Sequence, residues 1–315
     1  MSYINRFLSW IYYAVLINYT RKRVWEIFQT FFLLLGAYWT LIEFSSFLLE
    51  KFQSPEGHTP YKDALRNFVW NHLLVEFLLI LLISVFYNRR RLSHCIKLND
   101  SDLAIEFRFC DLFKQKGAKV IAVMDTFDTS FSQNLVNRNT LHGKVISKYY
   151  SGKEHILDRE IIDSLARTGA TPTESNPNLK GKKDKFPIGT TVVVEPNSEY
   201  FYLLALTEMT PTGNVIVKPE YLVDALSNLW QYIPTHGRSI DTINIPLIGK
   251  GLHRLPPEYT HQRIAREIAN SFVTSSKQQA FCKRLVVCIH PSDGEYVDLE
   301  KLAGYVGHLK EYEFQ

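Results

Sequence analysis

The sequence predicts an α/β protein whose mixed, mostly parallel sheet is covered by helices on both faces and is preceded by an α-helical transmembrane hairpin. Two observations support this fold class. Two apolar stretches of helix length lie near the start of the chain, and after Leu92 apolar clusters alternate between strand spacing and helix spacing. Alternating strands and helices favour right-handed crossovers, which produce a parallel or mixed sheet.

The apolar stretches run from Ile27 to Leu49 and from Phe68 to Tyr87. Each is long enough to cross a bilayer, since a spanning helix needs about 20 mainly apolar residues. Basic triplets border the outer ends, namely Arg21, Lys22 and Arg23 before the first stretch and Arg89, Arg90 and Arg91 after the second. Because basic flanks stay inside, we expect a two-helix hairpin over residues 21–91 with both termini of the chain cytoplasmic.

The first twenty residues contain an apolar run of about ten residues, which is too short to span a bilayer and lacks a small-residue cleavage site. Trp10, Tyr12, Tyr13 and Tyr19 suit the headgroup region. We expect residues 1–20 to form an interfacial amphipathic helix, with a buried soluble helix as the alternative.

Two carboxylates, Glu43 and Glu76, fall within the apolar stretches. A hairpin brings both into the outer half of the bilayer. Ionisable groups in lipid are costly and usually face a bundle interior or water. They are therefore either an acidic lining of an oligomeric assembly or protonated side chains near the interface.

Composition limits the remaining possibilities. The chain has 315 residues and a net charge of +4, much of it in the basic flanks, which favours contact with anionic lipid over nucleic acid. Its four cysteines show no CxxC spacing, so we expect reduced core cysteines and no metal site. Residues 92–315 suffice for one domain with a sizeable core.

Apolar periodicity predicts the elements of this domain. Strands are expected at residues 104–109, 119–124, 190–195, 200–207, 243–248 and 285–289. Helices are expected at residues 154–165, from Pro219 onward, through Ile264 and Phe272, and at residues 299–309. The polar run 168–185, rich in Pro, Gly, Asn and Lys, is expected to be an exposed loop inserted within the domain. Its charged stretch from Lys180 to Lys185 is expected to be solvated, with contact to ligand phosphates or anionic lipid as the alternative.

The segment from Ile245 to Ala269 has the features of a phosphate site. A buried strand ends in a glycine-bearing turn that leads to a helix, which would place backbone N–H groups and a helix N-terminus at the carboxyl edge of the sheet. Lys250, His253 and Arg254 add positive charge. The spacing GxG alone also occurs in many turns that bind nothing.

Three segments together resemble macro domains. IPLIGKGLHRLP, residues 245–256, resembles the diphosphate-binding loop of that fold, and FRFCDLFKQKGAKVIAVMDTFDT, residues 107–129, resembles its opening strands. NRNTLHGKVIS, residues 137–147, is similar to a shortened first ligand loop. The resemblance extends over most of Ala104 to Pro291. The hairpin followed by this domain resembles the membrane effector of the bacterial Thoeris antiphage defence system.

The resemblance implies a function and a location. In that family a TIR-domain partner makes an ADP-ribose-derived signal from NAD during infection, and this signal is expected to be an ADP-ribose conjugate. The cytoplasmic macro-like domain, residues 92–315, would bind this signal as a sensor and not as an enzyme, with no cofactor. The membrane part would then form a homo-oligomer in the bacterial inner membrane and disrupt the bilayer, causing abortive infection.

The resemblance also implies a set of ligand contacts. Asp111 and Leu112 would meet the adenine, and Asp125 and Thr126 occupy the place of the asparagine that enzymatic macro domains hold near the distal ribose. The diphosphate and distal ribose would be bordered by Thr140, Leu141, His142 and Gly143. The phosphates would be cradled by Gly249, Lys250, Gly251, Leu252, His253 and Arg254. The last two could instead be ordinary loop residues.

A membrane-anchored ADP-ribosyl hydrolase is the alternative function. It needs a water activated beside the distal ribose, for which Asp125, Asp128 and His142 are the candidate groups. The missing asparagine and the shortened glycine loop disfavour it. A plain scaffold protein, which would bind no nucleotide, is a third possibility.

Overall fold

The computed structural model describes residues 21–50, 60–89, 91–98, 103–132, 135–238, 240–250, 255–278 and 280–313. The chain divides into two compact units, Met1–Arg91 and Leu92–Gln315. The interfacial helix expected over residues 1–20 lies outside the described residues.

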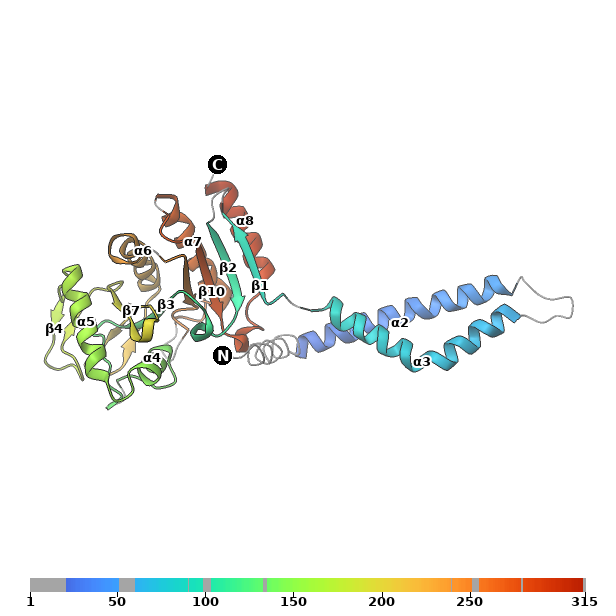
Figure 1. Cartoon of the computed structure of the whole chain (residues 1–315), viewed down its shortest axis with the longest axis horizontal. Helices are drawn as coiled ribbons and strands as arrows, with labels where there is room; N and C mark the ends of the chain where they lie inside the picture. The colour runs from blue at the N-terminus through green and yellow to red at the C-terminus, as the bar shows by residue number, and fades with distance from the viewer. Residues whose placement is uncertain are drawn as a thin grey trace. The chain divides into compact units, whose positions relative to one another are not determined.

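The first unit contains two long helices, α2 (Arg21–Leu49) and α3 (Pro60–Tyr87), which pack against each other (Figure 1). Both are long and apolar enough to cross a membrane, with mean hydropathies of 1.6 and 2.1. Helix α3 begins at Pro60 and not near Phe68, because proline suits the first turn of a helix and Asp63 complements the dipole there. The two expected apolar helices are therefore present.

Contacts between α2 and α3 are both apolar and polar. The Phe31 and Phe77 rings lie 5.8 Å apart, and the Asn88 amide donates to the Thr30 hydroxyl across 3.0 Å. Glu43 is exposed on the surface of the hairpin, whereas Glu76 is half-buried and its Oε1 has no hydrogen-bond partner among the described residues. The two carboxylates therefore lie in different surroundings within one hairpin.

The second unit is built on one large mixed sheet in the order β1-β2-β10-β9-β3-β7-β6, with β8 paired to β7. The five central strands run parallel to one another, and the strands at both edges, β1 and β6, pair with them antiparallel. The strands are β1 (Ser93–Lys97), β2 (Ala104–Phe109), β3 (Ala118–Met124), β6 (Thr191–Val194), β7 (Phe201–Met209), β8 (Val215–Ile216), β9 (Thr242–Pro246) and β10 (Arg284–Ile289).

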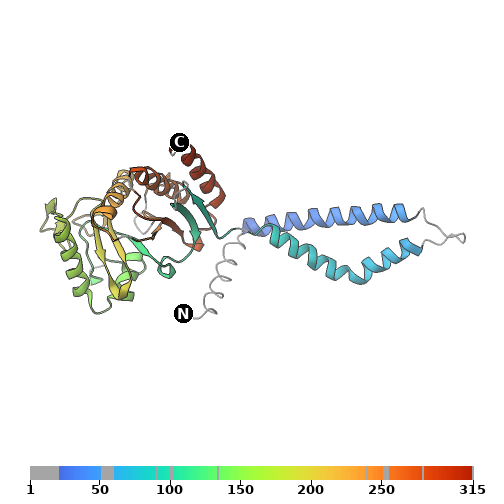
Figure 2. The ribbon, with the colours of Figure 1, turned by 45° about the horizontal axis from the view of Figure 1, so that its top comes forward.

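Helices cover both faces of this sheet (Figures 1 and 2). On one face, α4 (Leu141–Tyr149) and α5 (Glu154–Thr168) bury their apolar sides against β3, β6 and β7. The other face is covered by α6 (Pro219–His236), α7 (His261–Gln278) and α8 (Leu299–Glu313). Trp230 of α6 packs on Phe272 of α7 with ring centres 5.6 Å apart, so these helices share a second core.

Every expected strand and helix of this unit is confirmed, with ends shifted by a few residues. Three features were not expected. Helix α4 forms where a ligand loop was expected, the edge strand β1 precedes β2, and the polar run 168–185 contains the short pair β4 (Glu174–Ser175) and β5 (Asp184–Lys185). Cys95 is exposed on β1, so the expectation that all cysteines are core residues is wrong for it.

Candidate functional site

A cavity of about 790 Å³ opens at the carboxyl edge of the parallel strands. Residues that follow β2, β3, β9 and β10 line it together with the end of β7, as expected for parallel strands that terminate at one edge. A volume of this size suits a small organic ligand, for which pockets measure about 300–1,000 Å³. The sheet edge expected to bind phosphate therefore carries a cavity.

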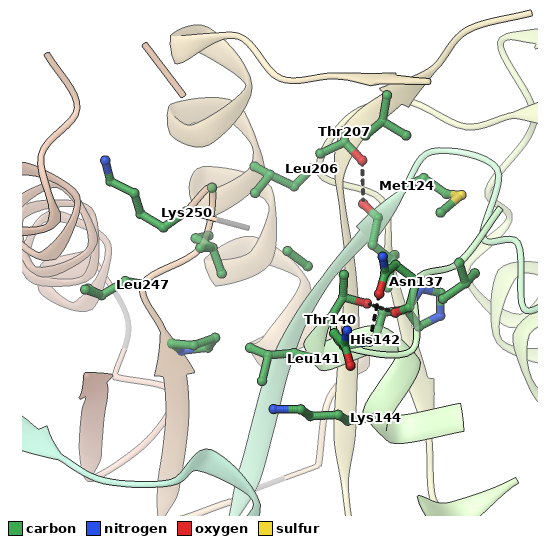
Figure 3. A pocket seen from close by; sticks show the side chains of 18 of the residues that line it. Met124, Asn137, Thr140, Leu141, His142, Lys144, Leu206, Thr207, Leu247 and Lys250 are labelled. Carbon is green, nitrogen blue, oxygen red and sulfur yellow. Dashed lines mark hydrogen bonds between the residues drawn. The ribbon is translucent and has the colours of Figure 1, made fainter. Parts of the chain in front are cut away.

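The first turn of α4 forms one wall of this cavity (Figure 3). Thr140 caps the helix, since its hydroxyl accepts the Gly143 N–H across 3.0 Å. The N–H groups of Leu141 and His142 lie in the first turn, where a helix offers no internal acceptor. A helix N-terminus with such donors attracts anions.

Gly143 has a different task from its neighbours. It is not among the residues that line the cavity. A Cβ at this position would lie 2.1 Å from the Asn137 carbonyl oxygen, so only glycine lets the preceding loop pack closely on α4. The expected contact at Gly143 therefore becomes a packing role that fixes the helix start.

His142 is the most deeply buried polar side chain of the cavity wall. It is 4% exposed, and its Nε2 has no hydrogen-bond partner among the described residues. Burial, with a smaller effect of the Lys182 charge, lowers the pKa of the imidazole from 6.5 to about 4. The ring is therefore neutral at physiological pH and presents an unsatisfied nitrogen.

The glycine turn after β9 lies across the cavity from α4 (Figure 3). Gly249 adopts φ 84°, which favours glycine, and its carbonyl accepts the Leu255 N–H across 3.1 Å. Gly249 and Lys250 line the cavity, whereas Gly251, Leu252, His253 and Arg254 lie outside the described residues. The turn thus places the backbone of Gly249 and the charged Lys250 at the carboxyl edge of the sheet, where the phosphate site was expected.

The helix after this turn, α7, begins at His261, close to its expected start. It contributes none of the described residues that line the cavity, although a helix N-terminus was expected there. The helix N-terminus at the cavity belongs instead to α4, which the sequence pattern did not identify as a helix. A segment of ten residues separates Lys250 from α7, which explains why the two are apart.

Asp111 and Leu112, expected at the adenine, both line the cavity directly after β2. Asp111 caps a short 3₁₀ turn, its carboxylate accepting the Phe113 N–H across 3.0 Å. Leu112 is 4% exposed and belongs to the buried apolar core. This turn therefore offers a carboxylate beside an apolar surface.

Asp125 and Thr126 do not line the cavity within the described chain. The Asp125 carboxylate, 3% exposed, accepts the Met209 N–H across 2.8 Å, and burial raises its pKa to about 6. The Thr126 hydroxyl donates to Asp128 across 2.6 Å. The two side chains expected near a distal ribose are therefore engaged inside the protein.

Several residues of the wall were not among the expected ligand contacts. Lys144 lies one helical turn into α4, and Lys180 comes from the insertion between α5 and β6. His290 and Asp293 follow β10, at the carboxyl edge where a ligand is expected in any parallel sheet. That position after a buried strand is the signal that could have identified the last two. For Lys180 the signal is the basic stretch from Lys180 to Lys185, for which the sequence favours a solvated loop over contact with ligand phosphates.

No group of three or more His, Cys, Asp or Glu residues in the described ranges is placed to hold a metal ion. The chemistry of the cavity is that of an anion-binding and apolar site instead. Lysine ammonium groups, the N–H groups of the first turn of α4 and the uncharged His142 imidazole lie around apolar side chains such as Leu112 and Leu247. This combination suits a phosphorylated ligand with an apolar or aromatic part.

Comparison with known proteins gives a consistent match. The family model described as "Thoeris protein ThsA, Macro domain" matches residues 105–290. A curated Thoeris protein ThsA of Bacillus amyloliquefaciens (strain Y2) is 26% identical over 185 residues, 58% of this chain. The matched region spans 60% of the length of that relative.

Solved macrodomains of Oceanobacillus iheyensis are also similar in structure. One of them, an aspartate-to-alanine mutant, is 13% identical with a TM-score of 0.48, covering 69% of this chain and 98% of its own. The macrodomain with ADP is 13% identical with a TM-score of 0.40, covering 70% of this chain and 96% of its own.

Proposed function

We infer the function from family membership, because this chain belongs to the family of Thoeris ThsA macro-domain proteins. We propose that it is a ligand-gated membrane effector of antiphage defence. Its macro domain senses an ADP-ribose-derived nucleotide made by a TIR-domain partner, and its two apolar helices carry the response into the bacterial inner membrane. It acts as a sensor and not as an enzyme.

One observation carries this proposal. The cavity at the carboxyl edge has the α4 N-terminus on one side and the Gly249 turn on the other, with a lysine from each. The N–H groups of the first turn of α4, with a lysine on either side of the cavity, suit a diphosphate. The Asp111 turn supplies a carboxylate that could accept from an exocyclic amine, beside apolar side chains that suit a purine ring.

The membrane helices support the output step. Both are apolar enough to span a bilayer, and we propose that both termini are cytoplasmic, with residues 21–91 forming the membrane hairpin and residues 92–315 the sensor. For gating, the ligand must prefer one assembly state over the other, because equal affinity for two states shifts nothing. Small and polar residues such as Gly36 and Thr40 would let hairpins cluster.

A vesicle experiment tests the complete proposal. The full-length protein is reconstituted into dye-loaded vesicles and exposed to the deproteinised small-molecule fraction of phage-infected cells that carry the TIR-domain partner. We expect dye release with this fraction and none with the fraction from uninfected cells. Equal release with both fractions, or no release with either, would contradict the gated effector.

The ADP-ribosyl hydrolase alternative has less support. Asp125 is bound to the Met209 N–H, and the Asp128 carboxylate accepts from Thr126 and from the Lys182 N–H. Of the candidate bases, His142 alone lines the cavity. Release of ADP-ribose from an ADP-ribosylated protein by the purified full-length chain, lost in His142→Asn, would favour the hydrolase.

A further inference from the structure

Four lysines lie on the insertion between α5 and β6, and three of them make contacts within the protein. Lys182 pairs with Asp158 at 2.6 Å, Lys185 pairs with Glu208 at 3.0 Å, and the Lys183 ammonium donates to the Leu179 carbonyl. The Lys180 side chain makes no ion pair or hydrogen bond anywhere in the described chain. It is also the one lysine of the four that lines the cavity.

The backbone on both sides of Lys180 is held firmly. Leu179 is buried in the core at 2% exposure. A Cβ on Gly181 would lie 2.4 Å from the Asp128 carboxylate, and the next N–H, that of Lys182, donates to the same carboxylate across 2.8 Å. The Lys182 ammonium donates to the Phe127 carbonyl. Phe127 itself has a φ of 50°, which is unusual for a bulky residue. Lys180 is thus presented from a fixed base.

The Lys180 side chain lies against the turn between β7 and β8. A Cβ on Gly213 would meet the Lys180 Cδ at 3.0 Å and its Nζ at 3.6 Å. This turn is closed by the Thr210 N–H, which donates to the Asn214 carbonyl across 2.8 Å, and its residues Thr212 and Asn214 also line the cavity. An unpaired ammonium therefore stands beside hydroxyl and amide groups in the cavity wall.

We propose that Lys180 and the β7–β8 turn form a subsite for an anionic group of the ligand, either a phosphate or a carboxylate. The inference rests on the proposed function and deepens it, because it names the kind of ligand group that Lys180 and the β7–β8 turn would bind. An ammonium with no internal partner forms charge-assisted hydrogen bonds with such oxygens. The Asn214 amide donates one N–H to the Thr212 hydroxyl across 3.3 Å and keeps its second N–H for a neutral hydrogen bond to the same group.

Binding measurements on the full-length protein in detergent test this subsite. Wild type, Lys180→Gln and Lys183→Gln are titrated with ADP, with ADP-ribose, and with ADP-ribose phosphorylated on its terminal ribose. Lys183→Gln is the matched control, since it makes the same change of charge on the same loop but does not line the cavity. Thermal melting of each variant verifies folding.

We expect Lys180→Gln to weaken binding about tenfold, with a smaller loss at high salt because screening weakens exposed charges. A loss shared by all three probes identifies the anion as the diphosphate, and a loss confined to the third identifies an anion beyond the terminal ribose. If wild type binds a probe and Lys180→Gln binds each probe as tightly as Lys183→Gln does, the subsite is refuted. Absence of binding by wild type refutes the proposed function itself.

Discussion

The Asp125 carboxylate accepts the Met209 backbone N–H across 2.8 Å, which joins the end of β3 to the end of β7. The Asp125 carbonyl also accepts the Phe186 N–H across 3.0 Å, so one residue holds two segments beside the cavity. Met124, next to Asp125, and Thr207, two residues before Met209, line the cavity. Asp125 is therefore a positioning residue in this structure.

This role predicts a contrast between two substitutions. Asp125→Ala leaves the buried Met209 N–H unpaired and should destabilise the protein by about 1–3 kcal/mol. Asp125→Asn keeps an acceptor oxygen and removes a buried charge, so it should retain stability and nucleotide binding. Denaturant unfolding of the two variants measures the difference; an equal loss for Asn and Ala would contradict this role.

His142 predicts a dependence of stability on pH. The pKa of its imidazole in the folded protein, about 4, lies below the ordinary value of 6.5. Between these two pH values the unfolded chain therefore binds more protons than the folded protein does. The free energy of unfolding should fall as pH drops from 6.5 toward 4, by about 3 kcal/mol in full. Urea unfolding at pH 7 and at low pH measures it.

The comparison for that measurement is His142→Asn, which should lose less stability on acidification than wild type does. His308→Asn is the control, because His308 is exposed on α8 and 78% of its side chain is accessible. If the free energy of unfolding of His142→Asn falls on acidification as much as that of wild type, another group causes the fall.

The glycine turn predicts a loss of binding without a loss of fold. A Cβ on Gly249 would lie 2.6 Å from Leu255 Cδ1 in a left-handed backbone conformation, so Gly249→Ala should displace the turn and weaken ADP-ribose binding about tenfold or more. Gly152→Ala is the matched control, with φ 70° but nothing near its Cβ. Equal affinities of the two variants would exclude this turn from the site.

The exposed carboxylate of the hairpin predicts a role in assembly. Glu43 faces outward from α2, where a lone carboxylate in lipid is costly, so we expect it to face another hairpin or water in the active assembly. Glu43→Leu should insert normally and reduce ligand-triggered dye release. Leu41→Ala, at a position with 64% exposure, is the control, and full release by Glu43→Leu would refute the acidic lining.

Periodicity predicted the strands of the sheet and most helices because burial imposes apolar spacing on each of them. It did not predict α4, since the nine-residue helix is short and its sequence, LHGKVISKY, has a histidine and a glycine in its first turn. The sequence does not predict the bond from Asp125 to the Met209 N–H, because a carboxylate after a strand can turn either to a ligand or to the next strand. The basic stretch around Lys180 fits a solvated loop as well as a phosphate contact, and only contacts between distant segments place Lys180 at the cavity.

Calorimetric titration of the full-length protein in detergent with ADP-ribose tests most directly whether this cavity is a nucleotide sensor. We expect saturable binding of one nucleotide per chain, a higher melting temperature in its presence, and weaker binding by Gly249→Ala. A folded wild-type protein that shows neither heat nor a shift in melting temperature with ADP-ribose, ADP or terminally phosphorylated ADP-ribose would contradict the sensor.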